Sequence, residues 1–319
     1  MSAPATGRIN PFLIPGREDA PMSTLCPWRE NRHTDVDLYV EVDNYRPALR
    51  EFQARFTTPS LLRESSRLAL VAGDSGCGKS ALRNHCAHWL RERLGEVGLR
   101  GEILDLSRAI DLTDRENPII DINKRISHVC GELVHQLAGL DLIDGNAKER
   151  FGRAETSAHV YAELAAALDA KEQADVVLIV LLPSVDLLAE VKQYLAMRGP
   201  RVVFFAESAT VRVPDLDSIG RGNDVEVPPA TMTVGTLSAA DIRTFIDRRY
   251  EQRAKDGVFP RLDDAAVEAL MTDTMSIAML QALLTGLYNE LRWGPDEYSN
   301  EATIGEKRLF KYILQRFTP

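Results

Sequence analysis

The chain has 319 residues, of which 45% are hydrophobic and 27% charged, as in a folded globular protein and unlike a disordered or fibrous one. Its formal net charge is −9 at pH 7, so the charge does not support DNA binding, which would need a local basic patch or an assembled ring. The longest apolar run, residues 176–182, has the length of a strand, and no membrane span is expected.

Residues 1–40 contain five prolines and little periodicity, and we expect an extended N-terminal arm here. Such a segment is not expected to bury enough apolar surface to order itself. Two alternatives follow for this arm: a floppy tail, which the composition favours, or a segment that drapes over a neighbouring subunit.

Residues 41–235 are predicted to form an α/β domain, because strand-like and helix-like segments alternate. The expected strands are 68–71, 102–106, 176–182, 201–206 and 224–227, and the expected helices are 45–56, 80–97, 119–137, 154–171 and 185–197. The run at 176–182 is continuously apolar, which indicates a strand buried on both faces. The alternation therefore predicts a three-layer fold, with a parallel five-stranded sheet covered by helices on both sides.

Residues 236–319 are predicted to form a small all-helical lid domain. Its expected helices are 238–255, 263–272, 276–293 and 303–317. Ser238 followed by Asp241 has the pattern of a helix N-terminus, and Asp263 is expected to cap the second helix.

One motif carries strong chemical information. Residues 73–80, GDSGCGKS, match G-x-x-x-x-G-K-[ST] (Walker A) between a predicted strand and a predicted helix. In such a P-loop the backbone N–H groups and the helix N-terminus bind a polyphosphate. Lys79 is then expected to reach the β- and γ-phosphates of ATP or ADP, and the Ser80 hydroxyl to ligate Mg²⁺. The predicted nucleotide-binding residues are Gly73, Asp74, Ser75, Gly76, Cys77, Gly78, Lys79, Ser80 and Ala81.

Together with the strand order and the predicted lid, whose first segment is VGTLSAADIRTFIDRRY, the P-loop makes residues 43–317 resemble the AAA+ superfamily. Within it, the chain is similar to bacterial ATPases of the origin-recognition-like and transposition-regulator-like kinds. The resemblance implies bound ATP or ADP with Mg²⁺. It also implies assembly with further copies of the chain or with a related ATPase subunit.

The chain departs from this family at the Walker B acids. The resemblance implies an Asp that holds Mg²⁺ and a Glu that activates water after the third strand, yet Pro183 and Ser184 stand at those positions. Neither can hold a metal electrostatically or accept a proton at neutral pH. The nearest acid, Asp186, is expected to be an ordinary charge at the start of the next helix.

Other positions are assigned by the same resemblance. Ser208, at the end of the fourth strand, is of the polar type that the family uses as a phosphate sensor. Glu207 is the carboxylate that could replace the missing base, although a Glu at a strand end is more often a loop residue or a salt-bridge partner. Arg221 occupies a place from which family members reach a neighbour's nucleotide, although a solvated loop arginine is an equal alternative. The second sensor arginine of the family is expected near 276–279, where this sequence has none.

The first lid helix carries a cluster of basic residues interleaved with acids. The cluster comprises Arg243, Arg248, Arg249, Arg253 and Lys255. We expect a solvated charged face here in preference to a nucleic-acid surface.

Three functions follow, in order of preference. The first is a cytoplasmic AAA+-like ATP-binding protein with weak or absent hydrolysis, in which nucleotide controls assembly or a protein partner. The second is an active motor or loader on DNA or protein whose catalytic acid has moved, for example to Glu207. The third is a small-molecule kinase, which shares the P-loop. Four cysteines without C-x-x-C spacing, and no secretory signal, are typical of reduced cytoplasmic thiols.

Overall fold

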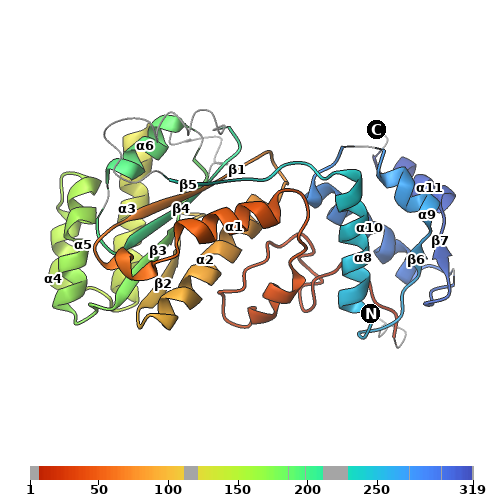
Figure 1. Cartoon of the computed structure of the whole chain (residues 1–319), viewed down its shortest axis with the longest axis horizontal. Helices are drawn as coiled ribbons and strands as arrows, with labels where there is room; N and C mark the ends of the chain where they lie inside the picture. The colour runs from red at the N-terminus through yellow and green to blue at the C-terminus, as the bar shows by residue number, and fades with distance from the viewer. Residues whose placement is uncertain are drawn as a thin grey trace.

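A parallel five-stranded sheet in the order β2-β3-β4-β1-β5 forms the centre of the larger part of the chain (Figure 1). The strands are β1 (Arg67–Ala72), β2 (Arg100–Asp105), β3 (Val176–Leu181), β4 (Val202–Ser208) and β5 (Ala230–Thr233). This computed structural model describes residues 7–110, 121–185, 187–197, 199–210, 229–272, 274–295 and 297–317. The expected strand at 224–227 lies outside the described residues. The strand that completes the sheet, β5, follows it.

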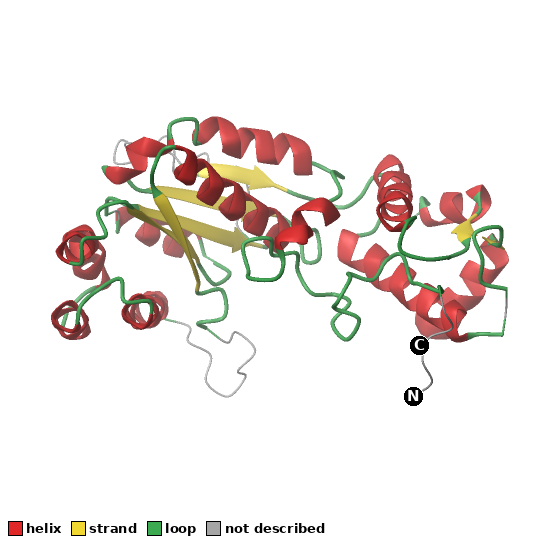
Figure 2. Cartoon of the chain, turned by 90° about the horizontal axis from the view of Figure 1, so that it is seen from below, coloured by secondary structure: helices red, strands yellow, loops and turns green. Residues whose placement is uncertain are grey.

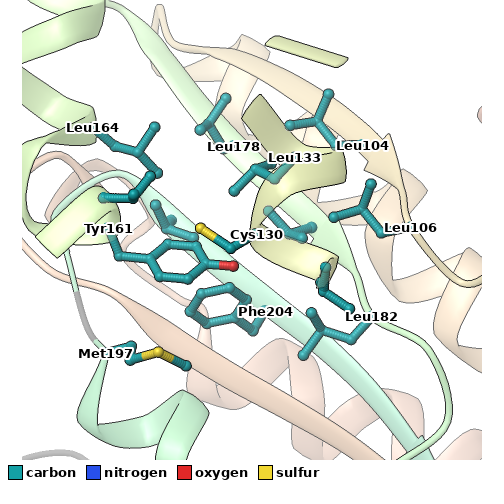
Figure 3. Packing of buried hydrophobic residues seen from close by; sticks show 14 of the residues in the cluster. Leu104, Leu106, Cys130, Leu133, Tyr161, Leu164, Leu178, Leu182, Met197 and Phe204 are labelled. Carbon is teal, nitrogen blue, oxygen red and sulfur yellow. The ribbon is translucent and has the colours of Figure 1, made fainter. Parts of the chain in front are cut away.

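Helices cover both faces of the sheet (Figure 2). On one face lie α1 (Tyr45–Arg55) and α2 (Lys79–Glu96); on the other lie α3 (Ile122–Gly139), α4 (Gly145–Gly152), α5 (Ser157–Ala170) and α6 (Leu188–Ala196). Along β4, Phe205 packs towards α1 and Phe204 towards α5, as the two-residue period of a strand requires. The Phe204 ring lies 5.2 Å from that of Tyr161 between centroids (Figure 3). This three-layer arrangement confirms the predicted fold class, and α4 is a helix that the periodicity did not predict.

The C-terminal part is helical, as expected. Its helices are α8 (Ala239–Arg253), α9 (Asp264–Leu270), α10 (Ile277–Trp293) and α11 (Glu306–Phe317). Ser238 and Asp241 form a capping box at α8, and Asp263 accepts a hydrogen bond from Ala266 N at α9. The expectation that strands cease in this part was incomplete, because β6 (Arg261–Leu262) and β7 (Thr303–Ile304) form a short parallel pair.

From residue 7 onward, the N-terminal arm is folded onto its own chain, contrary to the expectation of a floppy tail. Phe12 is only 1% exposed and packs in the apolar cluster of the lid. Asn10 Nδ2 donates to Thr285 O of α10 at 2.8 Å. Further along the arm, Leu25 O accepts a hydrogen bond from Asn84 Nδ2 of α2 at 2.9 Å. The arm is ordered because the apolar partners of Phe12 come from the far end of the chain, which local composition could not reveal.

The part of the chain that the structure describes contains no helix of the length and apolarity needed to cross a membrane.

Candidate nucleotide-binding site

The predicted P-loop connects β1 to α2 and has the backbone geometry that its glycines allow. Gly76 has φ +78°, in the left-handed region that favours glycine. Gly73 passes so close to β5's C-terminal extension that an added Cβ would lie 2.1 Å from Val234 O. The loop also touches the lid, because Ala278 N at the start of α10 donates to Gly76 O at 3.0 Å. The loop is thus held between sheet and lid by its own backbone.

Lys79 is the first residue of α2, and its ammonium turns back into the loop. Its Nζ lies 2.7 Å from Gly73 O and 2.6 Å from Asp74 O. The first N–H groups of α2 have no partner within the helix and, with the helix dipole, favour an anion at the same end. A cation and a helix N-terminus therefore converge on one point of the loop, as the binding of a polyphosphate requires.

A cavity of about 330 Å³ opens over this point, and we call it the P-loop cavity. Its size lies within the usual range of small-molecule sites, about 300–1,000 Å³. The P-loop supplies one wall, the arm a second and the lid a third. The lining residues include Ser75, Gly76, Gly78, Lys79, Ser80 and Ala81 of the loop, Met22 to Leu25 of the arm, and Phe245, Arg249, Ile277, Ala278 and Gln281 of the lid. Sequence reasoning missed the wall made by the arm.

Glu207 is the carboxylate of the cavity, and both of its oxygens have partners. Ser80 Oγ donates to Oε2 at 2.7 Å, and Arg83 Nη1 of α2 lies 2.5 Å from Oε1. Glu207 and Arg83 are both buried. The structure therefore brings Glu207 to the predicted metal ligand, Ser80, and pairs it with a cation that the sequence did not single out.

The chemistry of these oxygens fits Mg²⁺ as it binds beside nucleotide phosphates. Magnesium usually takes one or two protein oxygens and completes its octahedron with phosphates and waters. Ser80 Oγ is such an oxygen, and Glu207 Oε2 is close enough to act through a water. Within the described ranges, no three His, Cys, Asp or Glu side chains form a metal cluster by themselves. A metal held here would thus depend on the nucleotide.

The end of β3 carries Leu182, Pro183, Ser184 and Val185, so the described strand end is without an acid, as the register predicted. Asp186 lies outside the described residues.

An acid that sequence reasoning missed, Asp105, stands at the end of the neighbouring β2. Burial opposes its charge, but hydrogen bonds from Ser107 and Arg29 keep its pKa below the ordinary value. Asp105 lines a second, more polar cavity with Glu207 and Ser80.

Ser208, a further predicted residue, is not among the lining residues of the P-loop cavity. Ser208 is fully buried, and its carbonyl accepts a hydrogen bond from Gly73 N at 3.1 Å. Its role as a phosphate sensor stays a prediction. Arg221 lies outside the described residues.

The Cys77 thiol packs in the cluster between α1, α2 and the sheet. Burial there, with the Asp74 charge, raises the pKa of the thiol and disfavours a reactive thiolate.

The lid arginines require a correction. Arg248 is exposed and Arg243 half-buried, but Arg249 and Arg253 are buried, so α8 is not solvated on all its charged positions. Arg249 and Arg253 are four residues apart and therefore lie on one face of α8, the buried one. The acids that alternate with the arginines in the sequence concealed this shared face. Arg249 lines the P-loop cavity and was missed as a site residue.

Comparisons with solved structures show the same fold. The ORC1 protein of Aeropyrum pernix in complex with DNA is similar with a TM-score of 0.52 and 14% identity, over 87% of this chain and 66% of that one. The ORC2 protein of Aeropyrum pernix, in ADPNP and ADP complexes, is similar with a TM-score of 0.55 and 12% identity, over 88% of this chain and 71% of that one. This chain thus spans about two thirds of the length of these structures. No family model and no curated relative matches the sequence.

Proposed function

We propose that this chain, a protein of the AAA+ fold, is a cytoplasmic ATP-binding protein that hydrolyses ATP weakly or not at all and uses bound nucleotide to control assembly. The observation that carries the proposal is the convergence of Lys79, Ser80 and the N-terminus of α2 on one cavity between sheet and lid. The similar ORC2 structure contains ADPNP and ADP, which supports nucleotide as the ligand class.

Weak hydrolysis follows from the carboxylates. Hydrolysis needs a base within hydrogen-bond reach of the attacking water, and the described end of β3 offers no acid. Glu207 is near, but Ser80 and Arg83 engage both of its oxygens. In this arrangement Glu207 orients the Ser80 hydroxyl and supplies negative charge beside the metal, rather than accepting a proton from water.

A second candidate function is an active AAA+ ATPase in which Glu207 replaces the missing acid. The 2.7 Å contact between Glu207 and Ser80 favours it, since the carboxylate already lies at the metal side of the site. Steady-state turnover separates the two candidates. Turnover within the usual enzymatic range, about 1 to 10³ s⁻¹, together with its loss in Glu207→Gln, would select the active ATPase.

The expected partners are further copies of the chain or a related ATPase subunit. DNA is not part of the proposal, because the net charge of −9 opposes it.

Calorimetric titration with ATP and Mg²⁺ tests the proposal. Lys79→Ala should raise the dissociation constant at least about tenfold, because it removes a charge-assisted contact to phosphate. Lys192→Ala, an exposed lysine on α6, is the matched control and should bind like the wild type. Equal affinity of the Lys79→Ala variant and the wild type would refute the assignment of this loop.

A further inference from the structure

Arg249 stands out among the charged groups of the lid because it is buried at the wall of the P-loop cavity. It is 8% exposed and lies on the turn of α8 that faces the loop. Its guanidinium carbon lies 5.2 Å from the Phe245 ring centroid, and Nη1 donates to Gln252 Oε1 at 3.2 Å. Its Nε is buried without a hydrogen-bond partner. A permanently charged group is thus held at a cavity with most of its donors unused.

The neighbouring arginines of α8 are balanced by acids, and Arg249 is not. Arg243 pairs with Asp264, Arg248 with Glu251 and Arg253 with Asp256, at 2.9, 2.9 and 3.0 Å. No carboxylate of the described residues lies within 4 Å of Arg249. Burial and the nearby Arg253 charge lower the pKa of Arg249 to about 10, which still leaves it charged at neutral pH. A buried cation without a counter-ion is costly, so an anion in the cavity would relieve that cost.

The rest of the lid wall offers no competing charge. Its other lining residues are Phe245, Ile277, Ala278 and Gln281. The segment at 276–279, where the family resemblance would place an arginine, contributes instead a cap: Ser276 Oγ accepts a hydrogen bond from Met279 N. Arg249 therefore supplies the positive charge on the lid side, opposite Lys79 on the loop side.

We infer that Arg249 is a phosphate-binding residue of the lid, which together with Lys79 grips the phosphate chain of the nucleotide from two sides. The inference rests on the proposed function and deepens it. A guanidinium presents forked donors that match phosphate oxygens, and Arg249 lines the same cavity as Lys79. A nucleotide held by both residues binds the closed arrangement more tightly than an open one, so it biases the position of the lid.

The test compares Arg249→Ala and Arg249→Lys with Arg253→Ala, whose arginine is one turn further along α8, equally buried, but paired with Asp256 and outside the cavity lining. ATP, ADP and inorganic tripolyphosphate are titrated against each full-length variant. Arg249→Ala should weaken ATP and tripolyphosphate by about ten- to hundredfold. Arg249→Lys should recover part of this loss, and Arg253→Ala should change affinity less than about threefold.

Thermal unfolding without ligand provides a second readout. Because Arg249→Ala removes an unpaired buried charge, its melting temperature without nucleotide should equal or exceed that of the wild type, while its shift on adding ATP should shrink. ATP binding unchanged in Arg249→Ala would overturn the inference and leave the proposed function intact, provided that Lys79→Ala still loses binding. Loss of ATP but not of tripolyphosphate would also overturn it, by placing the contact on the base or sugar. Absence of binding in the wild type would overturn both.

Discussion

The buried pair of Glu207 and Arg83 is the residue-scale feature on which the character of the site depends. Glu207 is a strand residue and Arg83 a helix residue, so their contact ties the end of β4 to the first turns of α2. The pair also fixes the Ser80 hydroxyl through the second carboxylate oxygen. An acid in this setting has a structural and an electrostatic function at once, and the two can be measured separately.

Glu207→Gln should lower the free energy of unfolding by about 3 kcal/mol, because it leaves the buried Arg83 without its counter-charge. It should also reduce the dependence of ATP affinity on Mg²⁺ concentration. Urea unfolding without nucleotide, and ATP titrations with and without Mg²⁺, measure the two effects. Glu96→Gln is the control, since Glu96 is exposed, its partner Arg93 is only half-buried, and the expected change is within about 1 kcal/mol. An unfolding free energy equal to that of the wild type would contradict the role of the pair.

The sequence predicted some residues of the candidate site and not others. The difference lies in whether a residue's role depends on its sequence neighbours or on distant segments. Lys79 and Ser80 lie in one short motif whose geometry is fixed by neighbouring glycines, so they were predictable. Arg249 and Asp105 gain their significance from burial against distant segments. On α8 the acids and bases alternate as on any exposed helix, and nothing local distinguishes Arg249 from Arg248.

At the scale of elements, the arm connects the lid to the P-loop helix. Phe12 is inserted among lid side chains, with ring centroids 5.1 Å from Tyr288 and 5.8 Å from Tyr250. Beyond it, residues 22–25 cross the P-loop cavity, and Asn84 of α2 then holds Leu25. The arm thus bridges the cleft in which nucleotide is expected to bind.

Phe12→Ala should cost about 3–5 kcal/mol of unfolding free energy, as expected for removal of a fully buried phenylalanine. It should also accelerate dissociation of a fluorescent ATP analogue, because one anchor of the arm is lost. Chemical unfolding and stopped-flow displacement measure these quantities. Phe310→Ala on α11, which removes a phenylalanine that is 44% exposed, should alter neither quantity. If the ATP analogue dissociates from Phe12→Ala at the wild-type rate, the arm does not help to hold the nucleotide.

The regular elements were predictable because their patterns are local. The helix at 45–56 is observed at Tyr45–Arg55 and the strand at 176–182 at Val176–Leu181. The helix at 154–171 was predicted too long at its start, since Thr156 caps α5 with its side chain and residues 154–156 are not helical. The order of the arm came instead from contacts with residues about 270 positions away, which no window of sequence contains.

At the scale of the whole molecule, the arm's attachment to its own chain changes how assembly is expected to occur. An arm folded in cis cannot extend over a neighbour, so the contact would rest on the sheet and lid around the nucleotide. Arg221, which lies outside the described residues, is the proposed contribution from the neighbouring subunit.

ATP with Mg²⁺ should therefore increase the sedimentation coefficient of the wild type, through association with itself or with a related ATPase. Arg221→Ala should weaken this ATP-dependent association, because a guanidinium that reaches the neighbour's phosphates is lost. Arg243→Ala, which removes a half-buried lid arginine, serves as control. A wild type that stays monomeric at saturating ATP, with no related partner captured, would contradict the proposal, as would an Arg221→Ala variant that assembles normally.

The insertion of Phe12 into the lid also has a consequence for synthesis. Gln281, whose side chain donates to Phe12 O, is made 269 residues later. At about 5–20 residues per second, that interval is roughly 13 to 54 s. For most of this interval Phe12 has left the ribosome, together with Leu13 and Ile14, while the lid surface that buries Phe12 has yet to be made. The sheet can be complete while this apolar tripeptide still requires shielding, so the last helices close a core whose first residue was translated long before them.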